Sequence, residues 1–167
     1  MIHFFRRKIG KRGFTLIELL VVVSIISLLT AAVVSNLVMA RSKARDTKRK
    51  TDLHQLANAT ELRFNALATY PASAGWFSNA NHGGLDGSLT PTYIKTVSDD
   101  PLNTGNNVYM YWRKDYRGYT CLTAGTANQY GFYARLENPK ASDLATIIDS
   151  FDACVRDTWG MNYKVGN

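Results

Sequence analysis

The sequence predicts an α+β chain in which a long amino-terminal helix is followed by a small antiparallel β-sheet. Three observations support this prediction. The 22 residues from Leu19 to Ala40 carry no charge. Neither proline nor glycine occurs in residues 15–67, so nothing there breaks a helix. After Pro71 the chain consists of short β-prone segments separated by glycine and asparagine.

Charge is unevenly distributed along the chain. The 167 residues have a net charge of +7, from 20 Lys and Arg against 13 Asp and Glu. Five basic residues fall in residues 1–13 and six in residues 41–50, whereas residues 51–167 hold nine basic and eleven acidic side chains. The largest region is therefore slightly acidic, which argues against a nucleic-acid partner. Its many aromatic residues exclude a disordered chain.

The uncharged run has the length of a membrane span. As a helix, 22 residues extend roughly 33 Å, and a hydrocarbon core is about 30 Å thick. A cleaved signal peptide has a shorter apolar region of about 7–15 residues, so we expect the run to be retained. This excludes a simple soluble protein. Basic residues flank the run on both sides, so charge alone does not fix its orientation.

The helix is predicted to become amphipathic after the run and to end near Tyr70-Pro71, because the residue before proline disfavours the α conformation. One face is predicted to pack on the sheet, since apolar and small residues recur there at helical spacing. These residues are Leu53, Leu56, Thr60, Phe64 and Leu67. On the solvated side we expect the i,i+4 pairs Asp46–Lys50 and Lys48–Asp52.

The basic block at residues 41–50 has two interpretations. A ring of basic side chains beside an apolar span is typical of contact with lipid headgroups or neighbouring subunits. Nucleic-acid binding is the alternative, and helical geometry argues against it, because Arg41, Arg45 and Lys48 cluster while Lys43 and Lys50 point elsewhere.

The region after the helix is predicted to form three successive antiparallel strands, at residues 108–112, 118–123 and 130–136. The amphipathic half of the helix covers one side of this sheet. We further expect a short helix over residues 142–151 and a loop over residues 72–90.

A short motif stands at the start of the apolar run. It reads KRGFTLIEL over residues 11–19: basic residues, Gly13, aromatic Phe14, and Glu18 four residues later. This segment resembles the class III signal of type IV pilins and type II secretion pseudopilins. The resemblance implies that a prepilin peptidase cuts between Gly13 and Phe14, and that Phe14 is then N-methylated.

The same resemblance implies the organisation of the whole chain. It gives a type IV pilin-like fold with a cleaved leader (1–13), a transmembrane and assembly helix (14–40), an amphipathic helix half (41–70) and an exported β-sheet domain (71–167). Later segments resemble the family as well: residues 69–71, 89–94, 99–101, 109–111 and 133–137. The family's mid-helix proline is replaced by Ser35, so the helix either stays continuous or bends there.

Glu18 is the single charge in residues 14–40. A carboxylate inside an apolar span costs about 2.5–3.5 kcal/mol at mid-membrane, which marks it as a functional candidate. By resemblance, Glu18 and Thr15 act in subunit assembly, with Glu18 meeting the amino terminus of a neighbouring subunit. The alternative is a Glu18 that merely lies at the headgroup boundary.

The exported region contains both cysteines, Cys121 and Cys154. An even number in an exported domain argues for one disulfide, which the chain-entropy model values at very roughly 3 kcal/mol. Two free buried thiols are the alternative.

No catalytic motif is present, and we expect neither an enzyme nor a cofactor. Calcium is the one alternative, because major pseudopilins bind it after an Asp-Pro segment. Oxygen ligands are available here at Asp99, Asp100, Asn103 and Asn106. However, Asp-Asp-Pro also makes an ordinary turn, and the later acidic ligands of that family are not evident.

The sequence thus predicts a structural subunit, a prepilin that polymerises into a type IV pilus-like filament. The expected partners are further copies of the chain, the prepilin peptidase, an inner-membrane assembly platform, minor pilins and, before assembly, the lipid bilayer. The precursor is expected in the cytoplasmic membrane with its carboxyl-terminal domain exported, and the assembled form in a cell-surface pilus. One alternative is a type II secretion pseudopilin that forms a short periplasmic piston. Another is a membrane-anchored binding module that does not polymerise.

Overall fold

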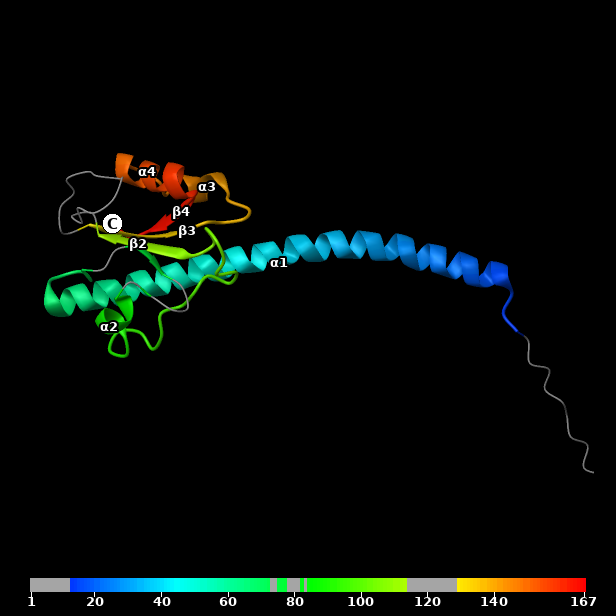
Figure 1. The fold of residues 1–167 in the computed structure, drawn as a ribbon, viewed down its shortest axis with the longest axis horizontal. Helices are drawn as coiled ribbons and strands as arrows, with labels where there is room; N and C mark the ends of the chain where they lie inside the picture. The colour runs from blue at the N-terminus through cyan, green and yellow to red at the C-terminus, as the bar shows by residue number, and fades with distance from the viewer. Residues whose placement is uncertain (1–12, 73–74, 78–81, 83, 114–128) are drawn as a thin grey trace, which may run out of the picture. The chain divides into compact units, whose positions relative to one another are not determined.

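The computed structural model describes residues 13–72, 75–77, 82, 84–113 and 129–167. Its elements, in chain order, are α1 (Leu16–Leu67), β1 (Gly75–Phe77), α2 (Leu85–Leu89), β2 (Tyr109–Arg113), β3 (Tyr130–Ala134), α3 (Ala141–Leu144), α4 (Ser150–Trp159) and β4 (Tyr163–Val165) (Figure 1). The chain divides into two compact units, one up to Ala40 and one from Arg41 onward. The predicted α+β class and pilin-like arrangement of a long helix with a small antiparallel sheet are confirmed.

In the first unit, α1 satisfies its polar side chains internally. The hydroxyls of Ser24, Ser27 and Thr30 each donate to the backbone carbonyl four residues earlier, at 2.7 Å. A hydroxyl bonded in this way needs no water, which suits a segment in hydrocarbon. The helix runs as a single element across Ser35, so the chain is not broken there, and whether it bends stays a prediction.

In the second unit, four antiparallel strands form a sheet in the order β1-β2-β3-β4. In the central pair Met110 lies opposite Tyr133 and Trp112 lies opposite Gly131. Because β2 and β3 pair directly, no strand lies between them, and the predicted strand 118–123 falls outside the described residues. The short edge strands β1 and β4 were not predicted, and β1 and α2 lie where a loop was expected.

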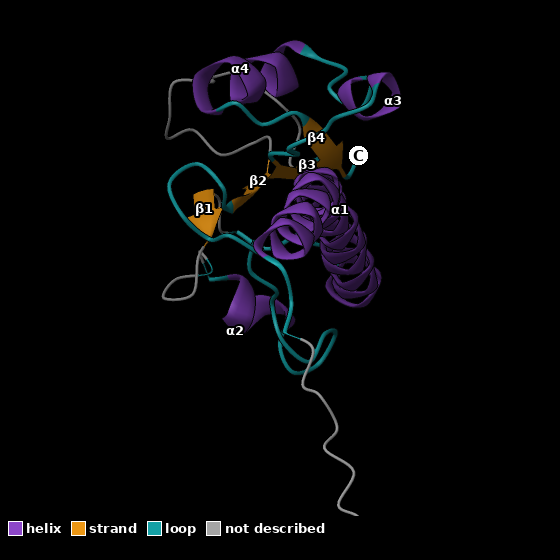
Figure 2. Ribbon diagram, turned by 90° about the vertical axis from the view of Figure 1, so that its right-hand side faces the viewer, coloured by secondary structure: helices purple, strands orange, loops and turns teal. Residues whose placement is uncertain are grey.

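Both faces of the sheet are covered, so its strands do not alternate between apolar and polar residues. Tyr109, Tyr111 and Phe132 join the cluster that includes Leu53 and Leu56 of α1. A second cluster lies on the opposite face and comprises Met110, Trp112, Tyr133, Phe151, Val155 and Met161. Figure 2 shows α1 on one side of the sheet and α3 and α4 on the other. The sequence predicted only the α1 layer.

The second covering layer differs from the single predicted helix over residues 142–151. The chain instead forms α3 and α4, and Ser150 begins the longer helix. The Asp149 side chain accepts a hydrogen bond from the Asp152 amide at 2.8 Å, and Gly160 ends the helix with φ 72°. These are common start and stop signals of a helix.

Most of the predicted packing face of α1 is confirmed. Leu53, Leu56 and Thr60 are fully buried, and Phe64 is partly buried against the core. The prediction is wrong for Leu67, which is 55% exposed. It is the last residue of α1, and Ala68 then takes a φ of 54°, so the chain leaves the helical path at this point.

A close approach within β3 requires glycine. A Cβ atom at Gly131 would lie 2.6 Å from the hydroxyl oxygen of Tyr133, which is on the same face of the strand. That hydroxyl donates a 2.6 Å hydrogen bond to buried Asp152, so it cannot move aside freely. Gly131 therefore lets the Tyr133 ring lie flat across β3 and reach α4.

Candidate functional site

The first candidate site is the start of α1, where Thr15 and Glu18 cap the helix reciprocally. The Thr15 amide and hydroxyl donate to Oε2 of Glu18 at 2.8 and 2.7 Å, and the Glu18 amide donates to the Thr15 hydroxyl at 3.3 Å. This arrangement is a capping box, which satisfies amides that the first helical turn leaves without partners. Within the described part of the chain, Oε1 of Glu18 accepts no hydrogen bond, so it is available to a donor from outside.

The surface around this cap is apolar and open. Every large hydrophobic side chain from Phe14 to Met39 is exposed, from 46% at Leu37 to 86% at Phe14. Phe14, Ile17, Glu18, Val21 and Val22 line an open hollow of about 340 Å³ on this helix. A surface so continuously apolar marks an interaction with lipid or with other protein. By length and composition, α1 includes a segment able to cross a membrane.

A second polar cluster, in the other unit, was missed by the sequence analysis. Arg49 is fully buried, and its Nε and Nη2 donate to the two carboxylate oxygens of buried Asp100, at 2.6 and 3.1 Å. Its Nη1 donates to Asp46 at 2.9 Å and to Glu137 at 2.8 Å. One guanidinium therefore joins α1 to the segment before β2 and to the segment after β3.

The spacing along the helix contained the signal for this cluster. Asp46 and Arg49 continue the stripe formed by Leu53, Leu56 and Thr60, with steps of three and four residues. Extending the apolar stripe towards the amino terminus would have placed both charged residues on the buried face. The predicted solvated position of Asp46 is wrong, because Asp46 is buried.

Three further basic residues of the block, Arg45, Lys48 and Lys50, also pair within the chain. Arg45 donates to Glu137 through two nitrogens, at 2.7 and 2.6 Å, and Lys50 contacts Asp143 at 2.5 Å. Of the two predicted i,i+4 pairs, Lys48–Asp52 is present at 2.7 Å, but Lys50 contacts Asp143 in place of Asp46. Much of the basic block thus holds the helix to its own domain.

The pairing of Glu137 gives a pH dependence of stability. The hydrogen bond from Arg45 lowers the pKa of Glu137 from 4.5 to about 2, against the effect of partial burial and with help from Arg49. As the pH falls, the unfolded chain therefore binds this proton first. Stability from this group is complete above about pH 4.5 and is lost as the pH falls towards 2.

We expect the temperature at the midpoint of thermal unfolding to decrease as the pH is lowered from 4.5 to 2. A Glu137→Gln variant should have a lower unfolding temperature at neutral pH, and this temperature should change less between pH 4.5 and pH 2. Melting curves of the two proteins in the same detergent and buffers would measure this. Equal pH dependence in both would contradict the assigned role of Glu137.

Comparisons with known proteins identify the family. Residues 9–34 match the family model described as the prokaryotic N-terminal methylation motif. The chain is 32% identical over 132 residues to the type II secretion system core protein G of Vibrio cholerae, and the match covers 71% of this chain and 83% of that protein. The chain belongs to the pilin and pseudopilin family. It is a pilin-like structural subunit.

Other relatives of this pilin-like subunit differ in how much of it they match. Core protein G of Escherichia coli is 29% identical over 134 residues, covering 72% of this chain and 86% of that protein. The type IV wide pilus major component PilA4 of Thermus thermophilus is 56% identical over 36 residues, covering 22% of this chain and 28% of that protein. No solved structure matches the subunit significantly.

Two of the calcium candidates of the pilin-like subunit, Asp99 and Asp100, are already engaged by other side chains. Asp100 is bonded to Arg49, and its Oδ1 also accepts from the amide of Leu102 at 2.8 Å. The side chain of Asp99 lies 3.2 Å from Nε2 of His82. Asn103 has a buried side-chain oxygen without a partner, but no group of three His, Cys, Asp or Glu residues converges in the described part of the chain. A buried guanidinium already supplies positive charge at Asp100.

We therefore expect calcium to leave the subunit's stability unchanged. The unfolding midpoint of the full chain in detergent, measured with excess calcium and with excess chelator, should agree within about 1 °C. Ligand binding at a hundred times its dissociation constant contributes about 2.7 kcal/mol, which is several degrees for a domain of this size. A shift of that order would contradict this expectation and show that the chain binds calcium.

The predicted disulfide joins two cysteines, of which only Cys154 is among the described residues. Cys154 lies on α4 and carries a disulfide bond. Its predicted partner, Cys121, falls outside the described residues, so the pairing stays a prediction. Gly13, Phe14, Thr15 and Glu18 are all described, and their roles in processing and assembly are taken up below.

Proposed function

We propose that this subunit is made as a single-pass membrane precursor and cut between Gly13 and Phe14. Phe14 is then methylated, and the chain polymerises into a type IV pilus-like filament. The leader stays on the cytoplasmic side and the domain after Ala40 is exported. Prepilin peptidase, an inner-membrane assembly platform, minor pilins and further copies of the chain are its partners, and no catalytic activity is involved.

The observation that carries this proposal is the apolar segment from Phe14 to Met39, most of which is helical. Its large hydrophobic side chains are all exposed, while the hydroxyls of Ser24, Ser27 and Thr30 are bonded to its own backbone. Such a helix is stable in lipid before assembly. It can equally pack against identical helices, which exchange lipid contact for protein contact.

The capping box at the start of this helix supports the assembly role of Glu18. Oε2 of Glu18 satisfies the Thr15 amide, and Oε1 accepts no bond from any described residue. After cleavage, the new amino group is on Phe14, next to Thr15 in the chain. Glu18 can then keep its own helix capped and accept the amino group of a neighbouring subunit through Oε1.

A type II secretion pseudopilin is the second candidate function. It is favoured by the share of this chain that the matches to core protein G cover. The two core protein G relatives cover 71% and 72% of this chain, so their matches include the exported domain. The matched pilins of Thermus thermophilus and Myxococcus xanthus cover only 22% and 35%.

Deleting the gene separates these functions. For a pilus subunit, sheared surface fibres disappear and protein secretion continues. For a pseudopilin, secreted proteins accumulate in the cell and the fibres are unaffected. If the deletion changes neither, and wild-type cells hold the protein uncleaved in their membranes, it is an anchored module and the proposed function is wrong.

A further inference from the structure

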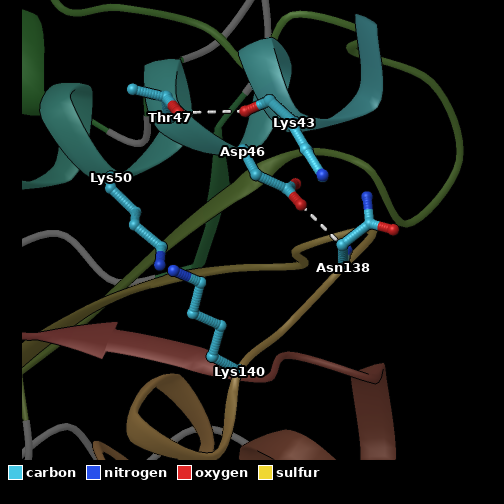
Figure 3. Close-up of a pocket in the computed structure, with 6 residues that line it drawn as sticks. All are labelled: Lys43, Asp46, Thr47, Lys50, Asn138 and Lys140. Atoms are coloured by element: carbon cyan, nitrogen blue, oxygen red, sulfur yellow. Dashed lines mark hydrogen bonds between the residues drawn. The ribbon is translucent and has the colours of Figure 1, made fainter. Parts of the chain in front are cut away.

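The unit from Arg41 onward contains a cavity rich in lysine. Its volume is about 330 Å³, at the lower end of the range for ligand sites. The lining residues come from α1 and from the segment that follows β3; they are Lys43, Asp46, Thr47, Lys50, Asn138 and Lys140 (Figure 3).

Asp46, the single carboxylate among the described lining residues, is already used by the fold. Asp46 accepts hydrogen bonds from the amides of Glu137 and Asn138, at 2.9 and 2.8 Å, and from Arg49. Its charge is therefore committed to the buried cluster and does little to offset the three lysines.

The positive charges of the three lysines are not fully balanced by nearby carboxylates. Lys50 contacts Asp143 at 2.5 Å, whereas neither Lys43 nor Lys140 has a carboxylate at salt-bridge distance among the described residues. Figure 3 shows Lys50 and Lys140 pointing toward each other. Although burial raises the pKa of Asp143, its hydrogen bond from Lys50 and the charges of Lys50 and Lys140 lower it overall. The ammonium groups of Lys50 and Lys140 therefore share the negative charge of one carboxylate, Asp143. The cavity keeps a net positive charge.

The cavity begins close to the end of the apolar run. Lys43 follows Ala40 by three residues, which advance about 4.5 Å along a helix and no more than roughly 11 Å even when extended. The headgroup layer on each side of the hydrocarbon core is roughly 5–8 Å thick. Lys43 is therefore close enough in the chain to reach the lipid phosphates when the span is inserted.

We propose that this cavity binds the phosphate of an anionic phospholipid in the leaflet on the exported side. Lys43 and Lys140 contact the phosphate oxygens, and Lys50, held by Asp143, adds positive charge beside them. The inference rests on the membrane insertion in the proposed function. It adds that a specific lipid binds the subunit before assembly and must leave the cavity if neighbouring subunits take its place.

Native mass spectrometry of the full chain in detergent tests this proposal. The probes are phosphatidylglycerol, phosphatidylcholine with the same acyl chains, and inorganic phosphate. The test variant is Lys43→Gln with Lys140→Gln. The matched control is Lys48→Gln with Lys95→Gln, which removes two exposed charges outside the cavity.

We expect the wild type to retain phosphatidylglycerol in preference to phosphatidylcholine. The test variant should bind phosphatidylglycerol about 25-fold more weakly, since each lysine at an anionic lipid surface contributes about fivefold. The control should change less than about threefold. Equal retention by test variant and wild type, or equal losses in test and control variants, would overturn the proposal. Displacement of the lipid by millimolar inorganic phosphate would overturn the lipid assignment.

The same samples show whether the proposed function itself fails. If the wild-type chain is extracted from membranes by alkali, it is not inserted, and the filament proposal fails with it. If all variants remain inserted and only the lipid preference is absent, the cavity assignment alone is wrong.

Discussion

Replacing Glu18 with alanine is expected to leave the subunit cleaved and inserted in the membrane but to reduce its entry into filaments at least tenfold. The carboxylate is the single charge in residues 14–40. A charge in an apolar span is costly without a partner, and no described residue donates to Oε1 of Glu18. Immunoblots of sheared and membrane fractions, with intact masses to confirm cleavage, would measure the effect.

A Glu18→Gln variant separates the two roles of this side chain. Glutamine can still complete a capping box with Thr15, but it cannot form an ion pair with an amino group. We expect Gln to restore helix capping and not filament yield. A normal yield from the Gln variant would assign Glu18 to capping alone, and a normal yield from the Ala variant would contradict any assembly role.

The second large effect is expected at Arg49. Replacing it with methionine should lower the free energy of unfolding by about 3–5 kcal/mol, the usual cost of removing one partner from a buried ion pair. Asp100 would lose the two hydrogen bonds it receives from the guanidinium, and Asp46 and Glu137 one each. Denaturant unfolding of the full chain in detergent would measure the loss.

Two further variants test the reason for this loss. Lys48→Met removes a pair whose lysine is 53% exposed, so it should cost no more than about 1 kcal/mol. Arg49→Lys keeps the charge but loses the planar guanidinium that contacts both oxygens of Asp100. Its loss of unfolding free energy should therefore lie between those of Lys48→Met and Arg49→Met. A loss below 1 kcal/mol for Arg49→Met would contradict a structural role for the cluster.

The long helix was the most predictable part of the fold, because its signals are local. The absence of proline and glycine from residues 15–67, and the Tyr70-Pro71 step, placed its ends within three residues of Leu16 and Leu67. The central strands β2 and β3 also followed from local β-propensity. The edge strands β1 and β4 did not, because three residues are too few to show a period.

Long-range charge pairing was the least predictable part. Arg49 meets Asp100 and Glu137 across 51 and 88 residues, and no local spacing indicates which carboxylate a basic residue will reach. The basic block was therefore interpreted as surface charge beside the membrane, although much of it is used inside the domain. The motif around Gly13 and Glu18 was recognisable because processing and helix capping both depend on adjacent residues.

The central claim is that this chain is processed at Gly13 and assembled into a filament, and the amino-terminal peptide of that filament tests it most directly. Filaments sheared from cells should be digested and the first peptide of the subunit sequenced by mass spectrometry. We predict a peptide that begins at Phe14 and carries one added methyl group on its amino nitrogen. A filament fraction without this chain, with the chain found only in membranes and still beginning upstream of Gly13, would contradict the claim.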